Sequence, residues 1–176
     1  EMSLVTLAPE PRWVVTATLD REEIREGIDR IEDVDAPVRF LDAIIEASER
    51  TAADMEPHRP VIVIVSGDGS DVSLGLLNRW NALLEQVRRN GITVHTLLMS
   101  TPRDFGRRRS LQEAAGLDFE ELTGGYYSSI YVGSSLNEPL TDVASAIRTR
   151  NRELARQYVI RYERPQEGEP RNVRVT

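Results

Sequence analysis

The chain has 176 residues, of which 40% are hydrophobic, and its formal net charge is −7 at pH 7. This length suits one domain with an ordinary core. The negative charge opposes binding to phosphate backbones, so we expect no nucleic-acid partner. The chain has no cysteine, which excludes disulfides, thiolate metal ligands and cysteine nucleophiles. No apolar run approaches the roughly 20 residues of a membrane-spanning helix, so we expect no span.

The first third of the chain predicts a hairpin followed by two helices. Residues 3–8 and 12–19 are β-rich runs separated by a turn that contains two prolines, which indicates a pair of short antiparallel strands. Asp20 with Glu23 forms a capping box ahead of a surface helix that has a narrow stripe of isoleucines. Residues 40–53 carry the apolar spacing of a second helix.

The middle of the chain predicts a strand, a helix and a second strand. Residues 61–65 are an uninterrupted Val/Ile run, typical of a parallel strand covered on both faces, and we expect this strand at the centre of the fold. A polar loop at residues 66–71 leads into a helix that ends at Asn90 and Gly91. Residues 92–99 form the next strand. This order predicts a right-handed parallel crossover, in which ligands gather at the carboxyl ends of the strands.

The rest of the chain continues the alternation. Residues 111–122 predict one or two short helices, and residues 126–131 are a short β-rich run. A further helix ends near residue 155, after which residues 157–162 and 172–175 predict a closing antiparallel pair. The whole pattern predicts an α/β fold with a mostly parallel central sheet and helices on both faces.

Five short motifs occur along the chain in a characteristic order. They are Leu-Asp-Ala-Ile at residues 41–44, an Asp-Gly loop within residues 61–71, Gly-Ile-Thr-Val at 91–94, Leu-Thr-Gly-Gly at 122–125 and Arg-Gln-Tyr-Val-Ile-Arg-Tyr at 156–162. With this order of elements, the chain resembles the von Willebrand factor A (VWA) domain, most closely the bacterial VWA-related family. The resemblance implies a Rossmann-like fold.

The same resemblance implies how the chain is divided. Residues 1–163 correspond to a VWA-like domain that lacks the family's first strand and helix, and residues 164–176 to a following loop and strand. We therefore expect the gap next to residues 61–65 to be filled by a strand from an upstream segment or from a second chain, because the central edges of a sheet are not left unpaired. The resemblance also favours a secreted or cell-envelope protein.

The family's metal-site residues are missing or replaced. The family uses Asp-x-Ser-x-Ser after its first strand, a Thr before the helix that here contains Asp42, and an Asp in the Asp-Gly loop. Here the first motif lies outside the chain, the Thr position falls on Val38, and the loop position falls on Gly67, or on Asp68 after a one-residue slip. Because a hard divalent cation needs several converging oxygens, we expect no metal and no other cofactor. Asp68 and Asp71 are the candidate ligands if a metal binds.

The leading hypothesis is therefore a non-enzymatic module that binds a protein partner without metal. Its contact loops lie at the carboxyl ends of the strands, at residues 34–38, 66–72 and 100–110. The candidate contact residues are Ser66, Asp68, Ser70, Asp71, Arg103 and Arg107. A simpler interpretation gives Ser70 or Asp71 the role of capping the next helix, and residues 107–109 that of a solvated loop. Tyr126, Tyr127 and Tyr131 are expected to pack in the core rather than to anchor a partner.

Two alternatives belong to other functional classes. The first is a metal-dependent adhesion site completed by residues outside the chain, with Asp68 or Asp71 as the acidic ligand. The second is a hydrolase that uses Ser66, His95 and Asp68, which the absence of a Gly-x-Ser-x-Gly nucleophile elbow disfavours. We expect structural roles for His95, inside an apolar strand, and for His58, among prolines, since neither has a partner at metal-ligand spacing.

Overall fold

A computed structural model describes residues 1–32, 36–53, 59–69, 71–73, 76–100, 110–131 and 135–156. The two strands expected at residues 157–162 and 172–175 lie outside these ranges, as do His58 and the boundary expected at residue 163. Within the described ranges, none of the helices combines the length and the apolar composition that crossing a membrane requires.

The N-terminal part forms the expected hairpin, which is a two-stranded sheet separate from the main one. Strands β1 (Met2–Thr6) and β2 (Arg12–Thr18) pair antiparallel, and helix α1 (Arg21–Asp29) packs on this hairpin. The Asp20 side chain caps α1 by accepting a hydrogen bond from the Glu22 backbone N–H at 2.8 Å. Gly27 is buried where α1 meets β2, and the two elements approach so closely that a Cβ at this position would lie 2.5 Å from Val15 Cγ2. The isoleucines of the expected stripe are largely exposed, since Ile28 is 52% and Ile31 42% exposed to solvent.

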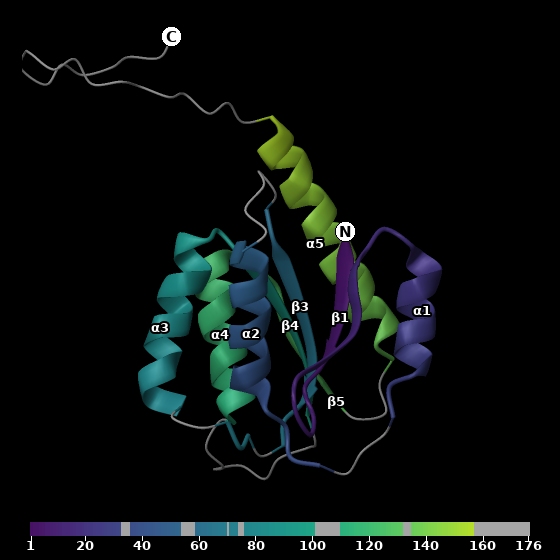
Figure 1. The fold of residues 1–176 in the computed structure, drawn as a ribbon. Coiled ribbons are helices and arrows are strands. Elements are labelled where there is room, and N and C mark those ends of the chain that lie inside the picture. The colour runs from purple at the N-terminus through teal and green to yellow at the C-terminus, as the bar shows by residue number, and fades with distance from the viewer. Residues whose placement is uncertain are drawn as a thin grey trace, which may run out of the picture.

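The main sheet has three parallel strands in the order β3-β4-β5. The strands are β3 (Val61–Gly67), β4 (Thr93–Ser100) and β5 (Tyr127–Tyr131), and the other helices are α2 (Phe40–Ala53), α3 (Leu76–Arg89), α4 (Leu111–Thr123) and α5 (Asn137–Ala155). Helices α2, α3 and α4 cover one face and α5 lies on the other (Figure 1). The parallel pairing of β3 with β4 and the helices on both faces confirm these two expectations.

Two apolar clusters hold the layers together. The larger one joins β3 and β4 to the three-helix face, and its members include Phe40, Leu41, Ile44, Ile64, Leu83, Val87, Val94 and Phe119. The smaller one joins β4 and β5 to α5 through Leu97, Ile130 and Val143. Helix α5 therefore covers β4 and β5.

Strand β3 corrects one sequence expectation. The Val/Ile run predicted a central strand covered on both faces, yet β3 is the edge of the three-stranded sheet. Val61, Val63 and Val65 are 37%, 42% and 39% exposed, on the α5 side of the sheet. The physical reason is that α5 packs on β4 and β5 and that no described strand pairs with the other edge of β3. The hairpin does not fill this position, because β1 and β3 belong to separate sheets.

The Thr123-Gly124-Gly125 turn joins α4 to β5. Gly124 ends α4 in the left-handed conformation, with φ of 64°, and Thr123 Oγ1 accepts a hydrogen bond from the Val94 backbone N–H at 3.1 Å. Gly125 lies directly against β4, since a Cβ at this position would be 1.8 Å from the Val94 carbonyl oxygen. The turn therefore fixes how closely α4 and β5 approach the sheet.

Candidate functional site

The loop after β3 is held against the start of α2 through Asp71. Its carboxylate accepts hydrogen bonds from the backbone N–H groups of Leu41, at 3.3 Å, and Ser73, at 2.6 Å. The sequence predicted that Ser70 or Asp71 would cap the helix that follows the loop. The structure shows a contact with α2, because Asp71 and Val38 form a parallel bridge that brings the N–H groups in the first turn of α2 to the carboxylate. Ser70 and residues 74–75, just before α3, lie outside the described residues.

The same contact continues along Val72 and Ser73, the two residues that follow Asp71. Val72 donates its backbone N–H to the Val38 carbonyl oxygen at 3.1 Å, and Ser73 Oγ accepts from the Asp42 backbone N–H at 3.3 Å. The Asp42 carboxylate in turn forms ion pairs with Arg39 and Arg79, so α3 is tied to the same corner. Segments that are about thirty residues apart in the chain thus form one junction at the carboxyl ends of the strands.

The Gly-rich part of the loop is attached to β4 and α4. Gly67 ends β3 opposite Met99, and the Asp68 backbone N–H donates to the Met99 carbonyl oxygen at 3.1 Å. Gln112, which is almost fully buried, donates a hydrogen bond from Nε2 to the Gly69 carbonyl oxygen at 2.8 Å. Sequence reasoning missed Gln112, because nothing in its local pattern distinguishes a glutamine that faces a distant loop.

The predicted contact residues are placed in different ways. Ser66 is buried and donates its hydroxyl to the Gly67 carbonyl oxygen at 3.1 Å, so it turns inward. Asp68 and Asp71 are half-buried at the carboxyl end of β3. Ser70, Arg103 and Arg107 lie outside the described residues, as do residues 33–35 and 101–109 of the two neighbouring loops.

Two positions that the resemblance assigned to metal ligands are described, with Val38 at the junction around Asp71 and Gly67 at the end of β3. Val38 is bonded to the Asp71 segment and presents methyl groups, and Gly67 presents no side chain. Both Asp71 oxygens accept backbone hydrogen bonds. Within the part of the chain that the structure describes, no group of three or more His, Cys, Asp or Glu side chains is arranged to hold a metal ion.

The structure does not bring the hydrolase residues together. Ser66 pairs with Leu98 and His95 pairs with Val63, so the serine and the histidine occupy opposite faces of the sheet. His95 is 2% exposed, and its Nδ1 accepts a hydrogen bond from the Tyr126 backbone N–H at 3.0 Å. Burial, with a smaller effect of the Arg150 charge, lowers the pKa of His95 below its usual value and favours the neutral ring.

The three tyrosines near β5 differ from one another. Tyr127 packs on α4, where its ring would lie 2.4 Å from a Cβ at Gly116, and Tyr126 packs partly against the smaller cluster. Tyr131 is 62% exposed at the carboxyl end of β5. The expectation of core packing is therefore wrong for Tyr131, since no described element covers the last residue of this strand.

Comparisons with known proteins identify the fold. No family model and no curated protein sequence matches the chain. Among solved structures, the SpRpn10 VWA domain is similar with a TM-score of 0.51 and 16% identity, over 82% of this chain and 70% of that chain. An uncharacterized membrane spanning protein from Vibrio fischeri matches 84% of this chain and 74% of its own length, with 19% identity and a TM-score of 0.34. The chain has a VWA-like α/β fold.

Proposed function

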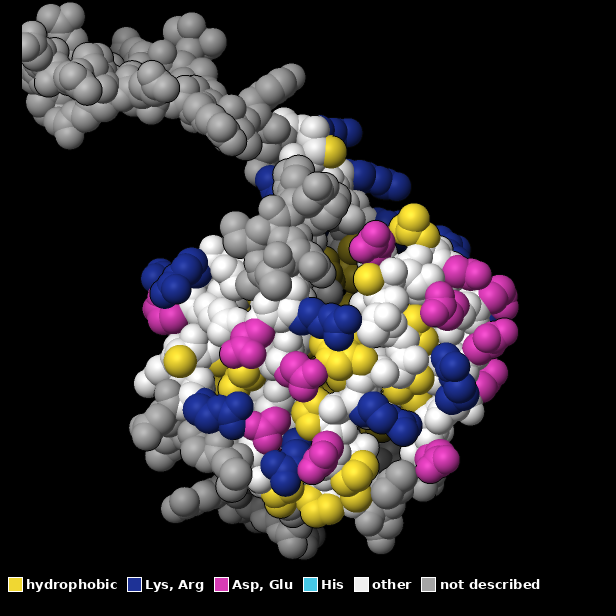
Figure 2. Space-filling model, in the orientation of Figure 1, with side chains coloured by type: hydrophobic (Ala, Val, Ile, Leu, Met, Phe, Trp, Pro, Cys, Tyr) yellow, Lys and Arg dark blue, Asp and Glu magenta, His cyan; other side chains and the backbone are white. Residues whose placement is uncertain are grey.

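We propose that this chain is a VWA-like protein-interaction module that binds a protein partner without catalysis and without a bound metal. The contact surface comprises the loops at the carboxyl ends of the strands, residues 34–38, 66–72 and 100–110, with Arg103 and Arg107 as candidate partner contacts. The VWA-like fold supports the class of function. The surface charge supports a partner other than nucleic acid, since acidic side chains gather over α1 (Figure 2).

The observation that carries the metal-free part of the proposal is the role of Asp71. Its carboxylate already accepts two backbone hydrogen bonds that join the β3 loop to α2. A cation at Asp71 would compete with these hydrogen bonds for the carboxylate charge, and each bond that it displaced would cost about 1–3 kcal/mol if the N–H stays buried. The neighbouring positions Val38 and Gly67 offer no side-chain oxygen in compensation.

Divalent cations are therefore expected to leave the stability of the protein unchanged. A ligand present at about one hundred times its Kd stabilises the folded state by about 2.7 kcal/mol, which a thermal melt detects easily. We expect equal Tm values in EDTA and in millimolar magnesium, calcium or manganese, and no saturable heat in titration calorimetry. The measurement uses the full-length polypeptide, so that ligands outside these residues are included.

The same experiment tests the metal-dependent alternative. A rise in Tm with magnesium that Asp68→Ala abolishes would contradict the metal-free proposal and assign Asp68 as the acidic ligand. Glu138→Ala is the matched control, because Glu138 is an exposed carboxylate in the first turn of α5 and is distant in sequence from the junction. This control variant should leave any response to magnesium unchanged.

We also propose that the free edge of β3 receives a further strand from the same polypeptide, outside the described residues. The edge belongs to a seven-residue strand without charge or proline, which is a template for aggregation if it is left open. Val61, Val63 and Val65 are exposed on one face of β3, so an added strand alone would not cover them. We propose that a helix following the added strand packs on this face and buries these three valines.

Hydrogen exchange of the full-length polypeptide tests this proposal. If the edge is filled, amides of β3 should exchange about as slowly as those of β4, which already lies between two strands. Exchange of β3 more than about tenfold faster than that of β4 would contradict a filled edge. Slow exchange that is lost on dilution, together with a concentration-dependent molar mass, would assign the added strand to a second chain instead.

A further inference from the structure

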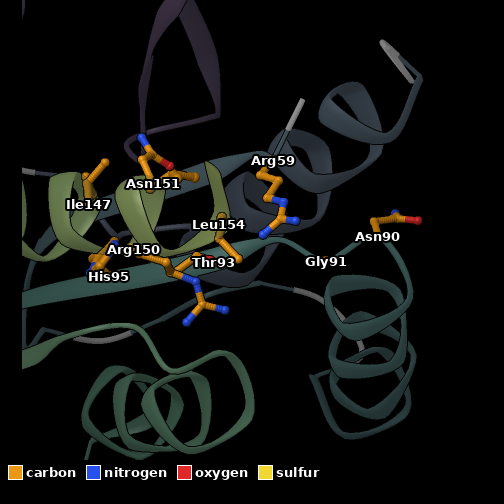
Figure 3. A pocket seen from close by; sticks show the side chains of 10 residues that line it. Arg59, Asn90, Gly91, Thr93, His95, Ile147, Arg150, Asn151 and Leu154 are labelled. Carbon is orange, nitrogen blue, oxygen red and sulfur yellow. The ribbon is translucent and has the colours of Figure 1, made fainter. Parts of the chain in front are cut away.

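A cavity of about 250 Å³ lies at the amino ends of β3 and β4, beneath the last turns of α5 (Figure 3). Its polar lining comprises Arg59, Asn90, Thr93, His95, Arg150 and Asn151. This is the end of the sheet opposite to the loop after β3, because the strands are parallel and the cavity contacts Val61 and Thr93, the first residues of β3 and β4. The cavity is therefore separate from the junction around Asp71.

The cavity is positively charged in a chain with a net charge of −7. Two guanidinium groups, those of Arg59 and Arg150, line it, and no carboxylate of the described residues does. Among the described residues, neither arginine forms an ion pair. Figure 3 shows the two arginines coming from different segments, Arg59 from just before β3 and Arg150 from α5. The charge of this cavity is thus not neutralised by the described part of the chain.

His95 lines the same cavity and carries a buried hydrogen-bond donor. Because its Nδ1 accepts from the Tyr126 backbone N–H, the proton of the neutral ring is on Nε2. Nε2 is buried and has no hydrogen-bond partner among the described residues. A buried donor without an acceptor is unfavourable, and native proteins rarely leave one. The lining therefore combines a donor that lacks an acceptor with two guanidinium groups that attract negative charge.

We propose that this cavity binds a small oxyanion group, a phosphate or a carboxylate, which accepts a hydrogen bond from His95 Nε2–H and lies between Arg59 and Arg150. Guanidinium groups recognise both oxyanions through paired N–H donors. Asn90, Thr93 and Asn151 supply further polar groups at the rim. A water molecule would also satisfy His95, but unlike an oxyanion it carries no negative charge to pair with the two guanidinium groups.

Nuclear magnetic resonance of the histidine rings tests the proposal directly. The chain has two histidines, so a sample with labelled imidazole rings gives two sets of signals, and His58→Gln assigns that of His95. Inorganic phosphate and acetate are titrated separately, with sodium chloride holding the ionic strength constant. We expect a saturable shift of the His95 signal, with tighter binding of phosphate or of acetate identifying which oxyanion the cavity prefers.

Substitutions distinguish a built site from general attraction of anions. Arg59→Gln removes an exposed side chain before β3 and should weaken binding at least about tenfold, as should Arg150→Gln. Arg152→Gln is the matched control, since it removes an exposed charge from the same helix outside the cavity lining and should change the affinity less than about twofold. Equal weakening in all three variants would reduce the effect to charge screening, and the absence of a saturable shift would leave water as the partner of His95. Either result overturns the proposal.

Discussion

Gly125→Ala is expected to lower the free energy of unfolding by more than about 4 kcal/mol or to prevent folding, the range of the most damaging single substitutions. The added Cβ would lie 1.8 Å from the Val94 carbonyl oxygen and 2.7 Å from its carbonyl carbon. These are backbone atoms of β4, which is the middle strand of the three-stranded sheet. Because they belong to the backbone and not to a flexible side chain, they cannot turn away to make room. Urea unfolding followed by circular dichroism measures the loss.

Gly69→Ala is the matched control for this substitution. Nothing lies within 4 Å of a Cβ built at Gly69, and its φ is not in the left-handed region. We expect a change of at most about 0.5 kcal/mol, as for other surface substitutions. If Gly125→Ala were as mild as Gly69→Ala, the close approach of the turn to β4 would be wrong.

Phe119→Ala is expected to have the second largest effect, a loss of about 3–5 kcal/mol. Phe119 is fully buried in the larger cluster, and its ring centroid lies 5.2 Å from that of Trp80 at an interplanar angle of 59°. Truncation leaves a cavity between α3 and α4 and changes the surroundings of Trp80. Urea unfolding measures the stability, and tryptophan fluorescence reports the change at Trp80.

Leu122→Ala provides the comparison on the same helix. Leu122 is 37% exposed and belongs to neither apolar cluster, so we expect a loss well below that of Phe119→Ala, about 1 kcal/mol or less. Similar losses for the two variants would mean that the packing of Phe119 contributes little beyond the helix propensity that both substitutions alter.

The sequence by itself determined the elements and most of their order. The Val/Ile run, the Asn90-Gly91 stop and the following β-rich run predicted two parallel strands joined by a helix, and the structure confirms this pairing. The capping role of Asp20 was also readable. These features depend on residues a few positions apart, whose periodicity and backbone preferences are present in the local sequence.

The tertiary structure alone decided which groups meet. Asp71 bonds to Leu41 in α2, and these two partners are 30 residues apart in the chain. The same Val/Ile run could belong to a central or an edge strand, and only the packing of α5 on β4 and β5 exposes the valines of β3. The cavity around His95 likewise joins Arg59, β4 and α5. Such contacts depend on how distant elements pack against each other, which no local pattern of residues encodes.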